Sequence, residues 1–392
     1  MPERLGRVLS PKVKERKQTD MLARQIMSAM PLRNVDLVLV GCALFLVGFG
    51  MLMIYSSTRL DVPGNPTYYV MRQIGSLVIG LILMAVFMLF DYRRLKVATP
   101  FIYGLVIFFL ILVFLTKEAF GSQRWITLGP LTIQPSEFAK LTVILLLANF
   151  FSENRQEPDT MRSFAVPVLW TAPIMLLIFL QPDLGTTLVV TAILLGLLFL
   201  AGARLRYWMA LTVGGAAVFA MGFVFHIFQQ YQIDRFLAFL KPGLNPKDIG
   251  YQLVQSKIAV GSGQFLGKGL TRGTQIGGGF VPVHSTDFIF SVIGEELGFV
   301  GALILIAAFC FLLWRTLRVA NNARDYYGSL LAMGIFTMLA FQLVVNIGMT
   351  IGIMPITGIP LPFISSGGSS LMVNLVAIGL LENIYMRRFA QF

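Results

Sequence analysis

The amino-acid sequence predicts an all-α integral membrane protein with about ten transmembrane helices. The 392 residues are 56% hydrophobic and 13% charged, and the mean hydropathy is +0.76. A soluble domain carries about 25% charged residues to cover its surface, so much of this surface faces lipid. Apolar stretches also recur along the whole chain, and each is close to the roughly 20 residues that cross a bilayer.

Ten apolar stretches have the length and composition of membrane spans. They cover residues 35–56, 74–90, 97–116, 133–151, 163–180, 184–203, 207–228, 286–314, 328–353 and 366–385. Residues 326–381, which hold most of the last two spans, contain no charged residue, and we divide this stretch at its prolines because proline cannot continue a helix. We therefore predict one polytopic membrane domain over residues 35–392, preceded by a basic tail over residues 1–34.

The distribution of Lys and Arg predicts how the spans are oriented. The tail and every second loop carry 20 of these residues, whereas the alternate loops carry 10. Six of the ten lie in the one long loop, residues 229–285, and the positive-inside rule is weak for long loops. Both termini are therefore expected in the cytoplasm, and the long loop between spans seven and eight is expected outside it. The net charge of +12 follows this membrane pattern, so we predict no nucleic-acid partner.

Several function classes lack support. Cys42 and Cys310 lie in separate apolar stretches and form no CxxC motif, and two histidines cannot build a His-rich metal site. The chain has no GxSxG, GxGxxG or HExxH motif, so hydrolase, dinucleotide and zinc-protease interpretations have no basis.

Two charged residues lie inside a predicted span, where each costs on the order of 2.5–3.5 kcal/mol at mid-bilayer. Glu137 and Lys140 are three residues apart, close enough to pair on one helix face. They form either an internal salt bridge that helps the fourth span insert, or the lining of a wet cavity in which Lys140 faces an anionic substrate.

Two aspartates stand at the outer ends of spans. Asp183 begins the sixth span after a tight turn, and Asp287 begins the eighth span where the long loop returns to the membrane. Either could cap its helix, because acidic side chains are favoured at a helix N-terminus. Asp287 could equally be a general base, since a partly desolvated carboxylate has a raised pKa. The spacing leaves both interpretations of Asp287 open.

Two irregular segments are candidates for ligand binding. The long loop has 57 residues, more than a connector needs, and is rich in glycine and in residues that bind sugars or phosphates. Residues 355–370 form a charge-free Pro- and Ser-rich segment that enters the membrane. Because lipid-exposed backbone cannot be irregular, this segment must be buried in protein or line a cavity.

Six segments, in order, resemble the SEDS family, named for shape, elongation, division and sporulation. They are residues 124–126 (RWI), 134–141 (QPSEFAKL), 181–186 (QPDLGT), 286–290 (TDFIF), 294–298 (GEELG) and 362–370 (PFISSGGSS). One such motif would be weak evidence, but six in the family's order are specific. The resemblance extends from about residue 35 onward.

Finer features favour one branch of the family and also show departures from it. Residues 357–363 and the segment from residue 255 to 269 resemble the RodA (elongation) branch more than the FtsW (division) branch. Val283 and Ser285 stand where the family usually has Glu and His, and Ser366 stands where it usually has Tyr. These changes put any role of a flanking acid or histidine in doubt, but they leave Asp287 intact.

The resemblance implies a peptidoglycan glycosyltransferase, an inverting lipid II polymerase, at the outer face of the bacterial inner membrane. The hydroxyl of one lipid II would attack the anomeric carbon of a lipid-pyrophosphate donor. The resemblance also implies a class B penicillin-binding protein as a partner that supplies transpeptidation. A divalent cation (Mg²⁺ or Mn²⁺) is left open as a cofactor.

The resemblance also implies residue roles. By position, Asp287 matches the family's essential aspartate and is the expected general base, and Trp125 corresponds to a functionally important tryptophan. The candidate substrate-binding residues are Trp125, Glu137, Lys140, Asp183, Arg235, Gln252, Lys257 and Lys268.

Two other functions fit part of the sequence. A lipid II flippase or transporter would explain ten spans, broken helices and intramembrane charges. A non-catalytic scaffold would only activate the penicillin-binding protein. The richest polar cluster is expected at the outer face and not near mid-membrane, and this favours the enzyme.

Overall fold

The computed structural model describes residues 34–115, 124–128, 131–154, 160–225, 230–240, 249–281 and 283–389. Within these residues, ten helices of 17 residues or more coincide with the ten predicted spans. They are α2 (Leu37–Thr58), α3 (Tyr68–Leu89), α4 (Tyr92–Leu112), α5 (Pro135–Glu153), α6 (Met161–Leu180), α7 (Leu184–Leu200), α8 (Leu205–Val224), α12 (Ile289–Asn321), α13 (Tyr326–Ile351) and α14 (Gly368–Met386). By length and composition, seven of them can cross a membrane, and α7 is a shorter apolar helix.

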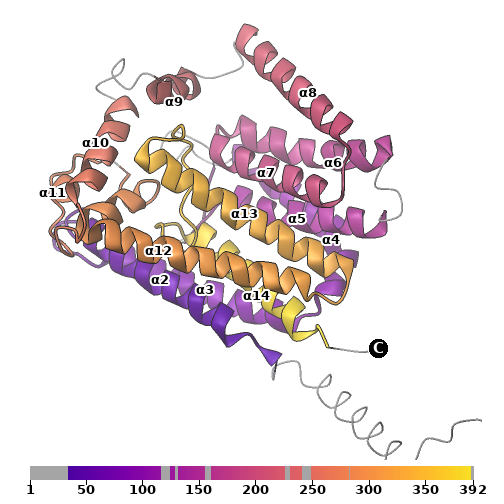
Figure 1. Cartoon of the computed structure of the whole chain (residues 1–392), viewed down its shortest axis with the longest axis horizontal. Helices are drawn as coiled ribbons and strands as arrows, with labels where there is room; N and C mark the ends of the chain where they lie inside the picture. Colours follow the sequence, from indigo (N-terminus) through magenta and orange to yellow (C-terminus); the bar gives the residue numbers. More distant parts are fainter. Residues whose placement is uncertain are drawn as a thin grey trace, which may run out of the picture.

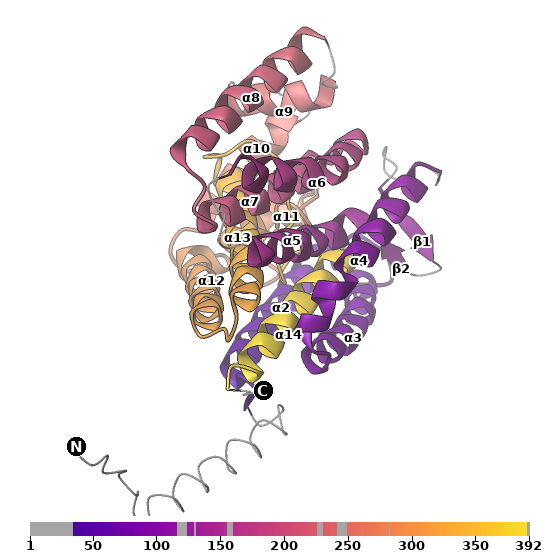
Figure 2. The same ribbon diagram turned by 90° about the vertical axis from the view of Figure 1, so that its right-hand side faces the viewer.

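The helices form a bundle with enclosed helices at its centre (Figures 1 and 2). Nearly every side chain of α5 and α14 is buried, whereas α3, α4 and α6 bury few of theirs. Helices α12 and α13 run side by side, and α14 packs mainly against α3. Helix α8 lies at the margin of the bundle in both views. The outer helices therefore present apolar surface to lipid while α5 and α14 are surrounded by protein.

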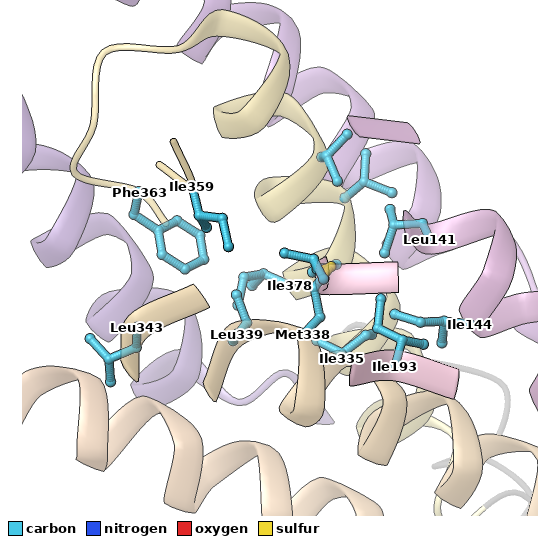
Figure 3. Close-up of a cluster of buried hydrophobic side chains, with 14 of the residues drawn as sticks. Leu141, Ile144, Ile193, Ile335, Met338, Leu339, Leu343, Ile359, Phe363 and Ile378 are labelled. Carbon is cyan, nitrogen blue, oxygen red and sulfur yellow. The ribbon is translucent and has the colours of Figure 1, made fainter. Parts of the chain in front are cut away.

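One apolar cluster joins the central helices (Figure 3). The close-up shows Leu141 and Ile144 of α5, Ile193 of α7, Met338 of α13 and Ile378 of α14 around a common centre, and all five side chains are buried. The cluster continues to Ile359 and Phe363 of the Pro-rich segment. This segment is thus fixed on the same core as the helices.

The segment from 229 to 285 is more regular than the predicted long loop. Its described part contains three helices, α9 (Gln230–Leu240), α10 (Ile249–Ser262) and α11 (Thr274–Gly277). Helix α10 packs against α12 and α13, where the buried Ser256 hydroxyl lies 2.6 Å from that of Ser291. The sequence did not predict these helices, because tertiary packing stabilises short glycine-containing helices whose own propensity is low.

Helix α12 is interrupted, although the sequence predicted a continuous span. Gly298 has φ 65° and ψ −160°, a conformation that is essentially restricted to glycine. Backbone groups freed by the break bond to the segment after α10: the Lys268 N–H donates to Glu295 O (3.0 Å), and the Phe299 N–H donates to Gln264 O (2.9 Å). Within a membrane, backbone N–H and C=O groups need hydrogen-bond partners from protein. Residues 264–268 supply the hydrogen bonds that a continuous helix would have made at the break.

The division of the charge-free stretch near its prolines is confirmed. Helix α13 ends at Ile351 with left-handed Gly352 as its cap, and α14 begins at Gly368. The irregular residues between them are largely buried, including Leu361 and Ile364 with no exposed surface. This burial meets the requirement that irregular backbone at membrane depth be enclosed in protein.

A short hairpin precedes α5. Strand β1 (Ile126–Leu128) pairs antiparallel with β2 (Leu131–Ile133), and α5 begins only at Pro135. The helix thus begins two residues after the predicted start at residue 133, because proline is preferred at the first position of a helix.

Candidate functional site

Asp287 lies in the turn that leads into α12 and does not cap the helix. The N-cap residue is Phe288, and no side chain makes a capping hydrogen bond there. Asp287 is half-buried as a residue, and its carboxylate reaches the Pro-rich segment instead: the Oδ2 atom lies 3.4 Å from the point where a Cβ on Gly358 would stand. The capping interpretation of Asp287 is therefore wrong, because the helix begins at Ile289, three residues later than the predicted start at residue 286.

Arg235 of α9 converges on the same point. Its Nη1 also lies 3.4 Å from the Cβ position of Gly358, a residue with φ +74°. The guanidinium and the Asp287 carboxylate thus flank one glycine, within reach of mutual electrostatic attraction. A Cβ at Gly358 would contact both groups.

Burial raises the pKa of the Asp287 carboxyl above its ordinary value. The positive charges of Arg235 and Arg124 and a hydrogen bond from Thr286 oppose this shift, and the negative charge of Asp183 adds to it. A general base works best when its pKa approaches the working pH, because it is then both deprotonated and basic. The surroundings of Asp287 move it in that direction.

Asp183 caps α7 and also joins two helices. Its carboxylate accepts hydrogen bonds from Thr186 N (3.1 Å) and Thr186 Oγ1 (2.9 Å). It also accepts from Gln134 Nε2 (2.9 Å) and Ser136 Oγ (3.1 Å) at the start of α5. The predicted cap is confirmed, and the same group ties the starts of α5 and α7 together.

The Arg124–Trp125 motif lies against the turn that carries Asp183. Arg124 Nε donates to Gln181 O (2.8 Å), and its Nη2 donates to Pro182 O. Trp125, the next residue, is half-buried at the start of the hairpin. The Arg124 charge, which acts on Asp287, is therefore held in place by backbone carbonyls.

Glu137 and Lys140 form the predicted ion pair. Lys140 Nζ lies 2.7 Å from Glu137 Oε2, and the two side chains are 1% and 4% exposed. Both belong to α5, one of the two most enclosed helices. The salt-bridge interpretation is confirmed, while a substrate contact of Lys140 stays a prediction.

The remaining candidates lie on or near α10. Gln252 is half-buried, and the Lys257 chain lies against the end of α13, its Nζ 2.5 Å from the Cβ position of Gly352. Lys268 Nζ is bound to buried Glu295 Oε1 (2.6 Å) and to Thr274 Oγ1 (2.7 Å), beside the break in α12. In the structure Arg235 thus lies near Asp287, whereas Lys268 forms an ion pair with Glu295.

Two residues near Asp287 were not among the sequence candidates. Arg124 was part of a quoted motif, but its charge was not recognised as an influence on Asp287. Asn346 of α13 is fully buried and donates from Nδ2 to Asp287 O at 2.9 Å. The sequence could have pointed to Asn346, because an amide side chain buried in a charge-free span needs polar partners.

The described residues do not form a protein cage for a divalent cation. Nowhere among them do three His, Cys, Asp or Glu side chains come together as metal ligands. Mg²⁺ is commonly held by one or two carboxylates together with substrate phosphates, so a cofactor role of Mg²⁺ or Mn²⁺ stays a prediction.

Comparison with known proteins gives the family. The family model for FtsW, RodA and SpoVE, described as a cell cycle protein, matches residues 36–389. Stage V sporulation protein E of Bacillus subtilis (strain 168) is 38% identical over 356 residues, which are 89% of this chain and 96% of that protein. Peptidoglycan glycosyltransferase MrdB of Escherichia coli (strain K12) is 37% identical over 354 residues, 88% of this chain and 92% of that protein.

A solved structure has the same architecture. It comes from work on the structural coordination of polymerization and crosslinking by a peptidoglycan synthase complex, and its TM-score is 0.76 at 31% identity. The match covers 91% of this chain and 99% of that chain. The predicted all-α membrane fold with about ten spans is confirmed. From its residue pattern, its helices and these relatives, the chain belongs to the SEDS family, which includes FtsW, RodA and SpoVE.

Proposed function

We propose that this chain is a peptidoglycan glycosyltransferase that polymerises lipid II into glycan strands during cell elongation, with Asp287 as general base. The observation that carries the proposal is the convergence of the Asp287 carboxylate and the Arg235 guanidinium on Gly358. Several relatives are named peptidoglycan glycosyltransferases, which supports the reaction class. The assignment to elongation follows the resemblance of residues 357–363 to the RodA branch.

The reaction divides into two tasks, which these residues match. Asp287 takes the proton of the acceptor sugar hydroxyl while the hydroxyl oxygen bonds to the anomeric carbon of the donor. The bond from that carbon to the lipid pyrophosphate breaks with inversion, and the pyrophosphate leaves with the electron pair. Arg235, with the Arg124 charge nearby, stabilises the negative charge that develops on the leaving group.

The proposal includes the setting of the enzyme. The chain lies in the bacterial inner membrane with both termini in the cytoplasm, so that Asp287 and α9 to α11 face outward. A class B penicillin-binding protein is the proposed partner, and the similar solved structure comes from work on a peptidoglycan synthase complex. The substrate contacts proposed for Trp125, Gln252 and Lys257 belong to this outward-facing region.

The test is lipid II polymerisation by the purified full chain. Asp287→Ala and Asp287→Asn are expected to lower the rate by about 10²–10⁴-fold, the usual contribution of general-base catalysis. The matched control is Asp91→Asn, because Asp91 also precedes a helix and its capping bond to Arg93 N can be made by asparagine. Full polymer yield from Asp287→Ala would remove Asp287 from catalysis.

The same set of variants tests the transporter alternative. The buried Glu137–Lys140 pair is the feature that favours a transporter, since intramembrane charges often mark transport pathways. If labelled lipid II moved across liposome membranes in a way that depends on Glu137 and Lys140, but not on Asp287, the transporter function would replace the proposed glycosyltransferase function. A scaffold would give no polymer from any purified form.

A further inference from the structure

Three consecutive backbone carbonyls just before α12 are each held by a distant part of the chain. The bonds run from Ser366 N to Ser285 O (2.9 Å), from Ser365 Oγ to Thr286 O (2.6 Å) and from Asn346 Nδ2 to Asp287 O (2.9 Å). One donor belongs to α13 and two to the Pro-rich segment. The turn that carries Asp287 is therefore tied at every carbonyl from 285 to 287.

Two of these donors, Asn346 and Ser365, also form hydrogen bonds with the backbone of residues 359–361. Asn346 Nδ2 donates to Ile359 O at 2.8 Å, and Ser365 Oγ accepts from Leu361 N at 2.8 Å. Asn346 is fully buried and Ser365 is 4% exposed, so water does not compete for these bonds. Each side chain thus joins the Asp287 turn to residues 359–361, directly after Gly358.

Non-glycine residues with positive φ lie just outside both joined segments. Val283 has φ +55° and Phe363 has φ +64°, values that residues other than glycine rarely adopt. Such conformations persist only when the surrounding structure enforces them. The hydrogen bonds of Asn346 and Ser365 hold the backbone within four residues of each of these positions.

We propose that Asn346 and Ser365 are positioning residues for glycosyl transfer. By holding the turn at 285–287 against residues 359–361, they fix the Asp287 carboxylate relative to Gly358 and to the Arg235 guanidinium beside it. Neither side chain needs to touch substrate. The inference rests on the proposed catalytic role of Asp287.

The chain offers a matched control in α14. Asn383 is also fully buried, and its Nδ2 also donates to two carbonyls, Phe87 O (2.6 Å) and Phe90 O. It lies 15 residues after Gly368, about 22 Å along the helix from the end that faces the Asp287 turn. Loss of Asn383 therefore removes an equivalent structural bridge without touching the site.

The experiment compares Asn346→Ala, Ser365→Ala, Ser365→Thr and Asn383→Ala in the purified full chain. Steady-state lipid II polymerisation gives kcat and KM, and hydrogen–deuterium exchange follows peptides spanning residues 283–291 and 359–367. We expect Asn346→Ala and Ser365→Ala to lower kcat by about 10²-fold, the effect of a misplacement near 1 Å, with KM little changed. Both peptides should exchange faster. Ser365→Thr keeps the hydroxyl and should recover kcat, and Asn383→Ala should leave kcat and both peptides unchanged.

The outcomes separate this inference from the proposed function. If the wild type does not polymerise lipid II, or if Asp287→Ala does, the proposed function fails, yet the exchange data still report on the tie between the two segments. Unchanged exchange in both Asn346→Ala and Ser365→Ala overturns the inference. So does wild-type kcat in these variants alongside an inactive Asp287→Ala, or an equal loss of kcat in Asn383→Ala. If Asn346→Ala fails to fold, the Ser365 pair decides by the same criteria.

Discussion

At the residue scale, opposing effects set the protonation of Asp287. Burial raises the pKa of its carboxyl group, while Arg235 and Arg124 restrain the rise. As a general base the group must be ionised, so the rate increases as the pH rises through this pKa. The acidic limb of the pH–rate profile should therefore lie at higher pH than for an ordinary aspartate.

Arg235→Met tests this balance. Removing the positive charge removes a contribution that lowers the pKa of Asp287, so the acidic limb of kcat/KM should move to higher pH. The control is Arg318→Met, because Arg318 stacks on Trp314 in the last turn of α12, far along the helix from Asp287. Polymerisation rates measured across pH give both profiles, and an acidic limb that stays in place in Arg235→Met would contradict the assignment.

The sequence located Asp287 but could not choose between its two interpretations. A cap and a base differ in where the carboxylate points, which depends on a helix start at Ile289 and on Gly358, some 70 residues away in the chain. Local rules did settle Asp183, because capping needs only a nearby backbone N–H. Arg124 was missed because its effect on Asp287 acts through space, between segments that are distant in sequence.

At the element scale, the break in α12 predicts that glycine is required at residue 298. Alanine there would adopt a φ of +65° at a cost of about 1–3 kcal/mol, and its Cβ would stand 2.3 Å from Gly267 N. Gly298→Ala should therefore lower the thermal unfolding temperature in detergent. Gly48→Ala is the control, since a Cβ at this helical position of α2 has nothing within 4 Å and alanine favours helix by about 1 kcal/mol. Equal unfolding temperatures for the two variants would contradict the strained break.

Helix boundaries were predictable where hydropathy and length decide them, and less so elsewhere. Prolines illustrate the limit: the stretch from 352 to 367 is irregular around Pro355 and Pro360, yet Pro167 and Pro173 lie inside α6. Tertiary packing, which a single sequence does not display, decides between these outcomes. The same reason explains why α9 to α11 were not foreseen.

At the scale of the whole molecule, the bundle encloses an ion pair that water cannot reach. Lys140→Met would leave Glu137 as an unpaired buried charge and should destabilise the protein by about 3–5 kcal/mol. Replacing both, as Glu137→Leu with Lys140→Met, should recover most of that loss. Unfolding in detergent measures both variants.

The surface pair of Lys96 and Glu153 is the comparison for this prediction. Its atoms are 3.3 Å apart, but the side chains are 34% and 59% exposed. Lys96→Met should therefore cost no more than about 1 kcal/mol. A similar loss in the free energy of unfolding for Lys96→Met and Lys140→Met would contradict the prediction, because it would mean that burial in the bundle does not make loss of an ion-pair partner more costly.

Helix α14 is synthesised after the helices that surround it. This helix follows every other described helix in the sequence, yet it lies at the centre of the bundle, with Asn374, Glu382 and Asn383 fully buried. During translation, the earlier helices enter the bilayer before the element that fills their middle has left the ribosome. We expect its polar groups to pass from the insertion machinery into contact with protein, because each would be costly in lipid. The core is therefore completed only after the other described helices have been made.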